Sequence, residues 1–341
     1  MSACADHEEW ILRVALILIL CLLVFGCKGQ RPLEAGPPIP LRLAWANLHD
    51  CSLVQLAAVK GFFKEEGLAV QVQSCGYGKA ALQAVLDGKA DLATVAETPL
   101  MFAVLGGQKL SVIGSIYTSN KKNGIVARRK SGISSPGDLI NKRIAFTQGT
   151  TSHIFLSSFL IANHLTMDQV TPVDLAPEQM QDALLSGKVD AVSTWSPTSK
   201  IIAERMGPDG VVLNDPHIYT ETFVIAGHAA FVDGNQEAMR RMLRALLRAE
   251  EYTARHPKEA QSIVFADLKL PPAMLAELWD EGACTVALDH ALLLALEEET
   301  RWAAKHRLAQ NVQMPNFLEV IDPRPLLSVK PEAVDPQVLR P

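Results

Sequence analysis

The stretch Ala84-Val85-Leu86-Asp87-Gly88-Lys89-Ala90-Asp91-Leu92-Ala93-Thr94 decides the fold, because it reappears 99 residues later as Ala183-Leu184-Leu185-Ser186-Gly187-Lys188-Val189-Asp190-Ala191-Val192-Ser193. In each copy a helix-like segment ends at a glycine, the residue that most readily takes the left-handed geometry of a helix end. The apolar run after Asp91 or Asp190 is typical of a buried strand. The repeat therefore predicts two similar units, each with the order helix, glycine, strand.

The likeness extends upstream of both copies. Strand-like Leu41 to Ala46 precedes a helix in the first unit, as Arg143 to Thr147 does in the second. Further strand-like segments follow at Val70 to Val72 and at Val170 to Leu175. Each unit thus reads β-α-β-α-β with right-handed parallel crossovers. We expect an α/β protein of two doubly wound lobes, since a chance likeness of two amphipathic helices would not repeat the order of all five elements.

The chain is expected to cross between the lobes twice. Polar stretches at Tyr117 to Gly124 and Pro216 to Thr222 bracket the second unit, so the first lobe is interrupted by the second. We assign residues 41–118 and 224–341 to the first lobe and 119–223 to the second, joined by a two-strand hinge.

Helices are predicted from capping signals and from glycine and proline breaks. The first helix opens with the capping-box pattern Ser52-Leu53-Val54-Gln55 and runs to Gly67, and another covers Pro99 to about Leu105. The last part of the chain is predicted to be helical at Gln236 to Arg255, Pro271 to Gly282 and Asp289 to His306.

Composition bounds the class of protein. A chain of 341 residues with 48% hydrophobic and 20% charged residues can build two globular domains with proper cores. The net charge of -5 offers no basic surface, which argues against a nucleic-acid partner.

The N-terminus has the pattern of an export signal. Val14 to Phe25 is an unbroken apolar run that is too short to span a bilayer comfortably and fits the core of a signal peptide. It ends in Leu23-Val24-Phe25-Gly26-Cys27, which resembles a bacterial lipobox. We predict a signal peptide at 1–26 and lipidation of Cys27. The alternatives are a simple membrane anchor or an unlipidated secreted form. Residues 27–40 are rich in proline and glycine and are expected to form a flexible tether.

Three cysteines remain beyond Cys27 in an exported chain, namely Cys51, Cys75 and Cys284. Cys51 begins the first helix and Cys75 ends the second strand, so both are expected at the same edge of a parallel sheet. An oxidising compartment permits a disulfide between Cys51 and Cys75. Two free buried thiols are the alternative.

Candidate ligand-binding residues follow the predicted strands, because ligands of open α/β sheets bind outside the carboxyl ends of the strands. They are Trp45, Asn47 and His49 after the first strand, Tyr77 after the second, Glu97 and Thr98 after the third, and Gln148, Thr150, Thr151, Ser152 and Trp195 in the second unit. Trp45, Tyr77 and Trp195 are expected to wall a cleft, with ordinary packing as the alternative.

Two of these positions suggest complementary charges. Thr150-Thr151-Ser152 stands at a helix start, where free N–H groups and the helix dipole hold anions. Glu97 follows an apolar strand, where an ionised carboxylate needs a partner such as a ligand ammonium. Plain helix capping and a structural ion pair are the respective alternatives. We expect a small zwitterion with its anionic group at the helix start and its cationic group at Glu97.

Motifs of catalysis are sparse. The chain has no His-Glu-x-x-His, no Gly-x-Ser-x-Gly, no phosphate-binding glycine loop and no Cys-x-x-Cys. Its nine histidines are scattered, so neither a metal site nor a cofactor is expected. The sequence favours binding over bond making.

Four short runs form a recognisable set. They are Lys60-Gly61-Phe62-Phe63-Lys64-Glu65-Glu66-Gly67-Leu68, Leu86-Asp87-Gly88-Lys89-Ala90-Asp91, Gln148-Gly149-Thr150-Thr151-Ser152-His153 and Gly187-Lys188-Val189-Asp190-Ala191. Together they resemble the nitrate/sulfonate/taurine group of ABC-transporter substrate-binding proteins, over about residues 41 to 330. The resemblance implies a two-lobed periplasmic-binding-protein fold of type II, with the ligand between Glu97-Thr98 and the Thr150-Thr151-Ser152 helix start. Asn47-Leu48-His49-Asp50 departs from the group, in which a glycine-containing loop is frequent here.

The resemblance also implies a role. A monomeric lipoprotein at the periplasmic or outer face of a membrane would close on a small ligand and deliver it to the permease and ATPase of an ABC importer. An enzyme of the pyrimidine-precursor synthase type is the leading alternative, although the cysteine-rich run of those enzymes is missing here. A ligand-sensing lipoprotein is a third interpretation.

Overall fold

A computed structural model describes residues 37–266, 268, 270–309 and 313–339. The predicted signal peptide at 1–26, the lipidation site Cys27 and the tether up to residue 36 lie outside the described residues. The chain from Ile39 onward forms one compact unit, which the following paragraphs describe.

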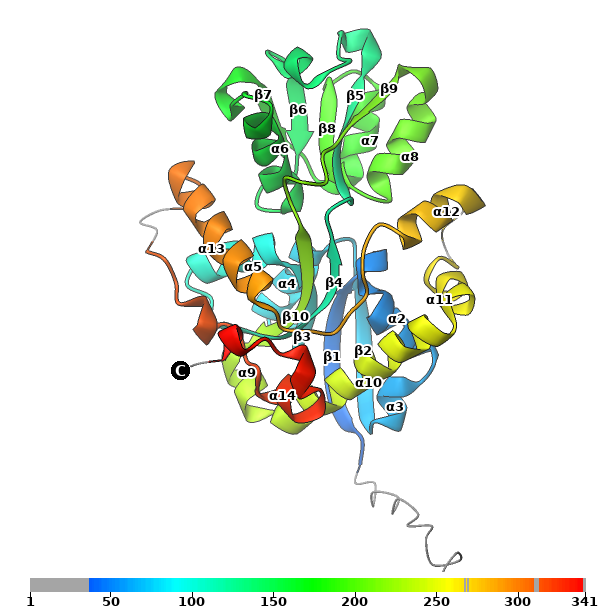
Figure 1. Ribbon diagram of the computed structural model, residues 1–341, viewed down its shortest axis with the longest axis vertical. Coiled ribbons are helices and arrows are strands. Elements are labelled where there is room, and N and C mark those ends of the chain that lie inside the picture. The colour runs from blue at the N-terminus through cyan, green and yellow to red at the C-terminus, as the bar shows by residue number, and fades with distance from the viewer. Residues whose placement is uncertain (1–36, 267, 269, 310–312, 340–341) are drawn as a thin grey trace, which may run out of the picture. The chain divides into compact units, whose positions relative to one another are not determined.

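Two five-stranded sheets form the framework of this unit (Figure 1). The first sheet has the order β2 (Leu68–Cys75), β1 (Ile39–Ala46), β3 (Leu92–Ala96), β10 (Glu221–His228) and β4 (Leu110–Ser119). The second sheet has the order β7 (Thr171–Asp174), β6 (Arg143–Phe146), β8 (Ala191–Trp195), β5 (Asn123–Arg128) and β9 (Gly210–Leu213). The two orders are equivalent, position by position.

Each sheet combines parallel and antiparallel pairs. β1 pairs in parallel with β2 and β3, and β6 does the same with β7 and β8. The fourth strand of each sheet is antiparallel to both of its neighbours. These fourth strands are β10 and β5, which adjoin the crossings between the sheets, so each lobe receives one strand directly from a crossing. The predicted α/β fold of two wound sheets is confirmed, with this antiparallel strand as an addition.

Helices cover both sheets. Those beside the first sheet are α2 (Ser52–Val59), α3 (Phe62–Glu65), α4 (Gly78–Leu86), α5 (Glu97–Leu105), α9 (Ala229–Gly234), α10 (Gln236–Arg255), α11 (Pro257–Val264), α12 (Pro272–Trp279), α13 (His290–Lys305) and α14 (Arg324–Val329). Those beside the second sheet are α6 (Thr151–Ala162), α7 (Pro177–Leu185) and α8 (Thr198–Met206). Lobe 1 here denotes the first sheet with its helices, and lobe 2 denotes the second sheet with α6 to α8. Among the described helices none is long and apolar enough to cross a membrane.

Most predicted helices are found within a residue or two of their expected bounds. The first predicted helix differs, because Gly61 takes a positive φ of 77° and separates α2 from α3. Its predicted cap was also wrong: Cys51 precedes α2, and the Ser52 hydroxyl donates to the carbonyl of His49. The helix α11 was not predicted.

Each lobe contains the same small set of hydrogen bonds, called the clasp here, which joins the turn before the third strand to the first strand. In lobe 1 the backbone N–H of Arg42 donates to Asp91 (2.7 Å) and its guanidinium donates to the carbonyl of Gly88 (2.9 Å). In lobe 2 the backbone N–H of Arg143 donates to Asp190 (3.0 Å) and its guanidinium donates to the carbonyl of Gly187 (2.9 Å). Each guanidinium also binds the carboxylate of its aspartate. The repeated Gly-Lys-x-Asp run therefore fixes the turn between a helix and the third strand onto the first strand.

The crossings between the sheets are short. β4 ends at Ser119 and β5 begins at Asn123, while β9 ends at Leu213 and β10 begins at Glu221. β4 and β10 pair along their whole length, so the two crossings lie side by side (Figure 1). The carboxyl ends of β3 and β8 reach the region of these crossings, and both strands are buried throughout.

Candidate functional site

A narrow cavity, with about 20 Å³ open to the centres of water-sized molecules, lies where the carboxyl ends of the strands meet the two crossings. Its walls come from Leu48, Tyr77, Gly78, Lys79, Ala96, Pro99, Lys122, Thr150, Thr151, Trp195, Glu221 and Phe223. Lobe 1, lobe 2 and both crossings contribute to this list. The cavity is therefore built from segments that are far apart in the sequence, and a change in the arrangement of the lobes would change its shape.

Four of the predicted ligand-binding residues line the cavity: Tyr77, Thr150, Thr151 and Trp195. The two aromatic rings face each other across the lobes, since Tyr77 precedes α4 in lobe 1 and Trp195 ends β8 in lobe 2. Their ring centroids are 6.3 Å apart and the rings are inclined by 33°. Burial raises the pKa of the Tyr77 hydroxyl, so it stays a neutral donor. The pair provides flat apolar contact from both lobes.

The start of α6 brings hydrogen-bond donors to the cavity. Thr150 takes an extended conformation just before the helix, and its carbonyl accepts the backbone N–H groups of His153 and Ile154 (3.0 and 3.5 Å). The backbone N–H groups of Thr151 and Ser152 have no acceptor among the described residues. The helix is 12 residues long, so its dipole adds positive potential at this end. The Thr150 hydroxyl donates to the carbonyl of Thr147 (2.8 Å), and the Ser152 hydroxyl accepts the N–H of Thr147 (3.0 Å). Ser152 therefore shapes the turn, while Thr150 and Thr151 face the cavity.

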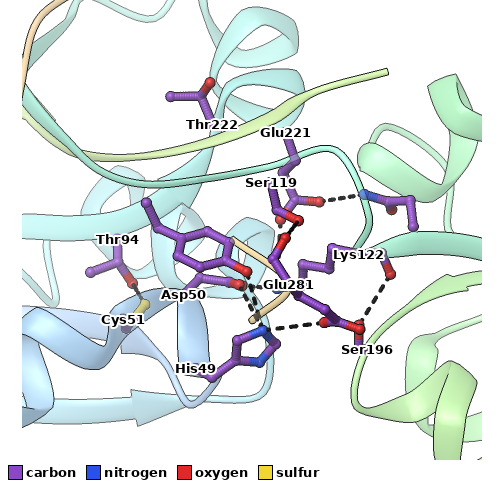
Figure 2. A network of polar contacts seen from close by, with 12 residues as sticks. His49, Asp50, Cys51, Thr94, Ser119, Lys122, Ser196, Glu221, Thr222 and Glu281 are labelled. Carbon is purple, nitrogen blue, oxygen red and sulfur yellow. Dashed lines mark hydrogen bonds and ion pairs between the residues drawn. The ribbon is translucent and has the colours of Figure 1, made fainter. Parts of the chain in front are cut away.

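Charged residues of the two crossings, which were missing from the predicted site, form part of the wall. Lys122 in the first crossing is 2% exposed, and Glu221 at the start of β10 is 1% exposed. The Lys122 ammonium donates to the buried carboxylate of Asp50 and lies 3.6 Å from the carboxylate of Glu221 (Figure 2). Asn123 donates to the other oxygen of Glu221 (2.7 Å). Two carboxylates thus lie against one ammonium, and Lys79 adds a second ammonium to the cavity wall.

Burial sets the protonation of this group. It lowers the pKa of the Lys122 ammonium, but the charges of Asp50 and Glu221 outweigh that effect, and the pKa lies above its ordinary value. Burial raises the pKa of Glu221, against the opposing charge of Lys122. Thr151 at the start of α6 acts in the same direction as Lys122 and lowers the pKa of Glu221. A cation or an N–H donor in the cavity would stabilise the ionised form of Glu221.

Glu97, expected to bind a ligand cation, does not line the cavity. Its side chain is fully buried, and its two oxygens accept hydrogen bonds from the hydroxyl of Tyr219 and from the backbone N–H of Thr222 (2.7 Å). Burial and the charge of Glu221 raise the pKa of Glu97 to about 8. Glu97 is thus held by a tyrosine and a backbone amide, and in the part of the chain that the structure describes neither a basic side chain nor the cavity meets its carboxyl.

Thr98 is held in a similar way, because its hydroxyl donates to the buried carboxyl of Glu299 on α13 (3.0 Å). Gln148 also lies outside the cavity wall, and its carbonyl accepts from the ammonium of Lys79 (2.7 Å), which links lobe 2 to lobe 1.

The loop after β1 places its predicted residues elsewhere. Asn47 is exposed, and Trp45 is half-buried with no partner for its indole nitrogen among the described residues. His49 is buried beside Tyr117, whose hydroxyl lies 3.4 Å from Nε2. Burial, followed by the charges of Lys122 and Lys200, lowers the pKa of His49 well below its ordinary value. Neighbouring Leu48 lines the cavity instead.

The expected disulfide between Cys51 and Cys75 is absent, and both thiols are free. β1 lies between β2 and β3, and Cys51 faces β3, where its thiol donates to Thr94 (3.1 Å). Cys75 ends β2 and packs among the alanines beneath α4. The two side chains therefore diverge from a shared sheet edge, a direction that sequence position does not reveal. In the described part of the chain, no three His, Cys, Asp or Glu side chains are grouped to hold a metal ion.

Signals for the missed residues were present but weak. Lys122 and Glu221 lie inside the two polar stretches that predicted the crossings, and each is adjacent to an apolar strand. A lone charge at such a junction has to be paired or solvated, and sequence alone does not tell which.

Comparisons with known proteins agree with this geometry. The family model described as NMT1/THI5 like matches residues 50–260, more than half of the chain. A protein of Brucella abortus named as a binding protein is 26% identical over 241 residues, covering 70% of this chain and 74% of its own length. A protein of Escherichia coli K12 named as an aliphatic sulfonates-binding protein is 25% identical over 228 residues, covering 65% and 70%.

The fold is matched by the crystal structure of the periplasmic aliphatic sulphonate binding protein SsuA from Escherichia coli. The TM-score is 0.71 at 20% identity, with 83% of this chain and 97% of that chain covered. The architecture is thus the two-lobed fold of periplasmic binding proteins. From the extent of the family match, the chain belongs to the NMT1/THI5-like family.

Proposed function

We propose that the protein is an extracytoplasmic solute-binding protein that captures a small zwitterionic solute, such as an aminosulfonate, and delivers it to an ABC importer. One observation carries this proposal: the wall of a cavity between two lobes holds free N–H groups at a helix start and the buried carboxyl of Glu221. The relatives named as sulfonate-binding support the anionic half of the ligand. The role is binding and not catalysis.

The two ends of the cavity recognise different charges. A sulfonate or carboxylate would bind at the start of α6, where Thr150 and Thr151 stand. An ammonium would bind at Glu221, in place of the Glu97 partner expected from the sequence, and the rings of Tyr77 and Trp195 would cover the carbon chain. A bare anion would offer no partner to the Glu221 carboxyl, so the site should bind it more weakly than a zwitterion.

Titration calorimetry with matched probes tests the ligand class. Taurine and ethanesulfonate share the sulfonate, but only taurine carries an ammonium group. We expect taurine, or a longer aminosulfonate, to bind at least tenfold more tightly than the sulfonate without the amine, because a charge-assisted hydrogen bond contributes about 1.5 to 3 kcal/mol. Stronger binding of ethanesulfonate would contradict the zwitterion.

A matched pair of variants tests the assignment of the carboxylate. Glu221→Gln should weaken aminosulfonate binding about ten- to a hundredfold, since the ammonium loses a charged acceptor. Glu97→Gln should leave that affinity unchanged, because Glu97 is fully buried outside the cavity wall. Equal losses in both variants would remove Glu221 from its proposed role.

We further propose that Cys27 carries a lipid that holds the mature protein at the periplasmic or outer face of a membrane, as a monomer that meets the permease and ATPase subunits of its importer. The apolar run and the lipobox-like residues before Cys27 support this. In Cys27→Ser the lipid acceptor is lost, and fractionation should find the protein released from the membrane or retained with an uncleaved signal. A variant that is processed normally and stays in the membrane fraction would refute the lipid anchor.

A further inference from the structure

We infer that Glu281 is a positioning residue for ligand binding: it fastens lobe 2 to the segment after α12 and so holds the cavity wall in shape without touching the ligand. This inference rests on the proposed function for its link to affinity, but its structural part concerns the ligand-free protein. Glu281 is 7% exposed and is absent from the cavity wall.

The backbone around Glu281 is fixed to lobe 1. Its carbonyl accepts the hydroxyl of Ser119 (2.7 Å), the last residue of β4. The next residues pair with the same strand, since Ala283 and Thr118 exchange backbone hydrogen bonds of 2.9 and 3.0 Å. Gly282 is packed so closely that a β-carbon there would lie 2.4 Å from the carbonyl of Thr118. This segment therefore cannot leave β4 without breaking several contacts.

The side chain of Glu281 reaches the other lobe. Its carboxylate accepts a hydrogen bond from Ser196, which follows β8 (Figure 2). It also pairs with the Lys200 ammonium on α8 (3.2 Å). The buried ring of His49 in lobe 1 lies 3.6 Å away. One carboxylate thus joins two residues of lobe 2 to a rigid part of lobe 1.

These contacts reach the cavity through one intermediate. Ser196 directly follows Trp195, and the backbone N–H of Ser196 donates to the carbonyl of Lys122 (3.1 Å). Trp195 and Lys122 both line the cavity. Holding Ser196 therefore places an aromatic wall from lobe 2 and the ammonium of the first crossing at the same time.

The carboxylate acts differently in different arrangements of the lobes. The backbone contact of Glu281 to Ser119 lies within lobe 1 and is kept if the lobes rotate, whereas the carboxylate contacts to Ser196 and Lys200 cross between lobes and are lost. An interaction that exists in one arrangement only shifts the population toward it. Glu281 therefore favours the arrangement described here.

A control residue is available four positions earlier, on α12. Glu277 also pairs with Lys200 (3.0 Å), but its side chain is 67% exposed and has no recorded bond to Ser196. Exposed pairs contribute little, because water screens them. Glu277→Gln therefore removes the same charge next to the same lysine without removing the buried link.

Hydrogen–deuterium exchange on the ligand-free full chain, followed by mass spectrometry, tests the inference. In Glu281→Ala we expect about tenfold faster exchange in peptides covering 120–124 and 195–201. A change of this size corresponds to the loss of one charge-assisted hydrogen bond. Peptides from β1 and β3 should be unchanged, as should all peptides of Glu277→Gln. Lys200→Met, which alters lobe 2 alone, should reproduce a smaller part of the effect and serves if Glu281→Ala does not fold.

Ligand affinity supplies the second arm, with taurine as the probe. Glu281→Ala should bind it several-fold more weakly through faster dissociation, and Glu281→Gln, which still accepts from Ser196, should restore part of the loss. Unchanged exchange at 120–124 and 195–201, or an equal rise throughout lobe 1, would overturn the inference. Because exchange is measured without ligand, failure of the aminosulfonate proposal would leave this outcome readable.

Discussion

The two lobes are built alike at the base of their sheets and differently at the carboxyl ends. Arg42 with Asp91 and Arg143 with Asp190 make the same set of hydrogen bonds. At the other end of the strands the repeat diverges: Ala96 of lobe 1 corresponds to Trp195 of lobe 2, and both line the cavity. The comparison shows that the repeat keeps the scaffold and varies the positions that line the cavity.

The residues that follow the third strands diverge in the same way. Glu97 of lobe 1 corresponds to Ser196 of lobe 2. Glu97 fixes the second crossing through Tyr219 and Thr222, whereas Ser196 bonds to the first crossing and to Glu281. Each lobe therefore uses the same position to hold a different crossing.

The largest expected effect comes from removing the buried ammonium of Lys122 in the first crossing. Lys122→Met removes the cation between Asp50 and Glu221 and leaves two buried carboxylates unpaired. We expect the free energy of unfolding to fall by about 3 to 5 kcal/mol, as for other broken buried pairs. Urea denaturation measures it, with the exposed neighbour change Lys121→Met as the control. Equal stability of the two variants would show that the buried pairing does not stabilise the fold.

The next effect distinguishes Glu97, which follows β3 and titrates, from Ser196, which follows β8 and does not. The raised pKa of Glu97, about 8, means that the folded state favours its protonated form. Its contribution to stability is therefore full below the ordinary pKa and is lost as the pH rises toward 8. Between pH 6 and pH 8 the free energy of unfolding should fall by roughly 2 kcal/mol more in the wild type than in Glu97→Gln, which mimics the protonated carboxyl.

Urea denaturation across that pH range measures the difference. Ser196→Ala in lobe 2 provides the control, because it carries no titrating group and its pH dependence should follow the wild type. A pH profile of Glu97→Gln that overlies the wild type would show that Glu97 is ionised throughout.

A smaller effect tests the equivalence of the two clasps. Asp91→Asn and Asp190→Asn should each lower the free energy of unfolding by about 1 to 2 kcal/mol at pH 7, since each loses charge-assisted bonds to arginine. Arg143 is the largest cause of the lowered pKa of Asp190, about 2. Its stabilising contribution is therefore present above the ordinary pKa and lost as the pH falls toward 2.

The cost of Asp190→Asn, measured by urea denaturation, should accordingly shrink between pH 5 and pH 2. A cost confined to one of the two variants would mean that the shared geometry does not carry shared energetics.

The smallest effect concerns the cysteines, which among the described residues all belong to lobe 1. Cys75→Ser should change the free energy of unfolding by under about 0.5 kcal/mol, because the thiol is free and makes no strong contact. Reducing agent should likewise leave the stability unchanged. If reduction lowered the free energy of unfolding by several kcal/mol, the thiols would not be free, and a Cys51–Cys75 disulfide would cross-link lobe 1.

The sequence by itself determined the repeat, the two wound sheets, the glycine ends of the helices and the donors at the start of α6. These features depend on spacing within a few residues, and a pattern of apolar residues, glycines and hydroxyls records such spacing directly. Tyr77 and Trp195 were found for the same reason, because each directly follows a strand or ends one.

Only the tertiary structure decided which charges are buried together. Asp50 and Lys122 lie 72 residues apart and Ser196 and Glu281 lie 85 apart, yet each pair is in direct contact. The crossings of the chain between lobes bring them together, and the cost of burying a charge then dictates its partner. The same reason removed Glu97 from the predicted site: its position after β3 was visible in the sequence, but the tyrosine and the backbone amide that occupy its oxygens come from the second crossing, over a hundred residues away.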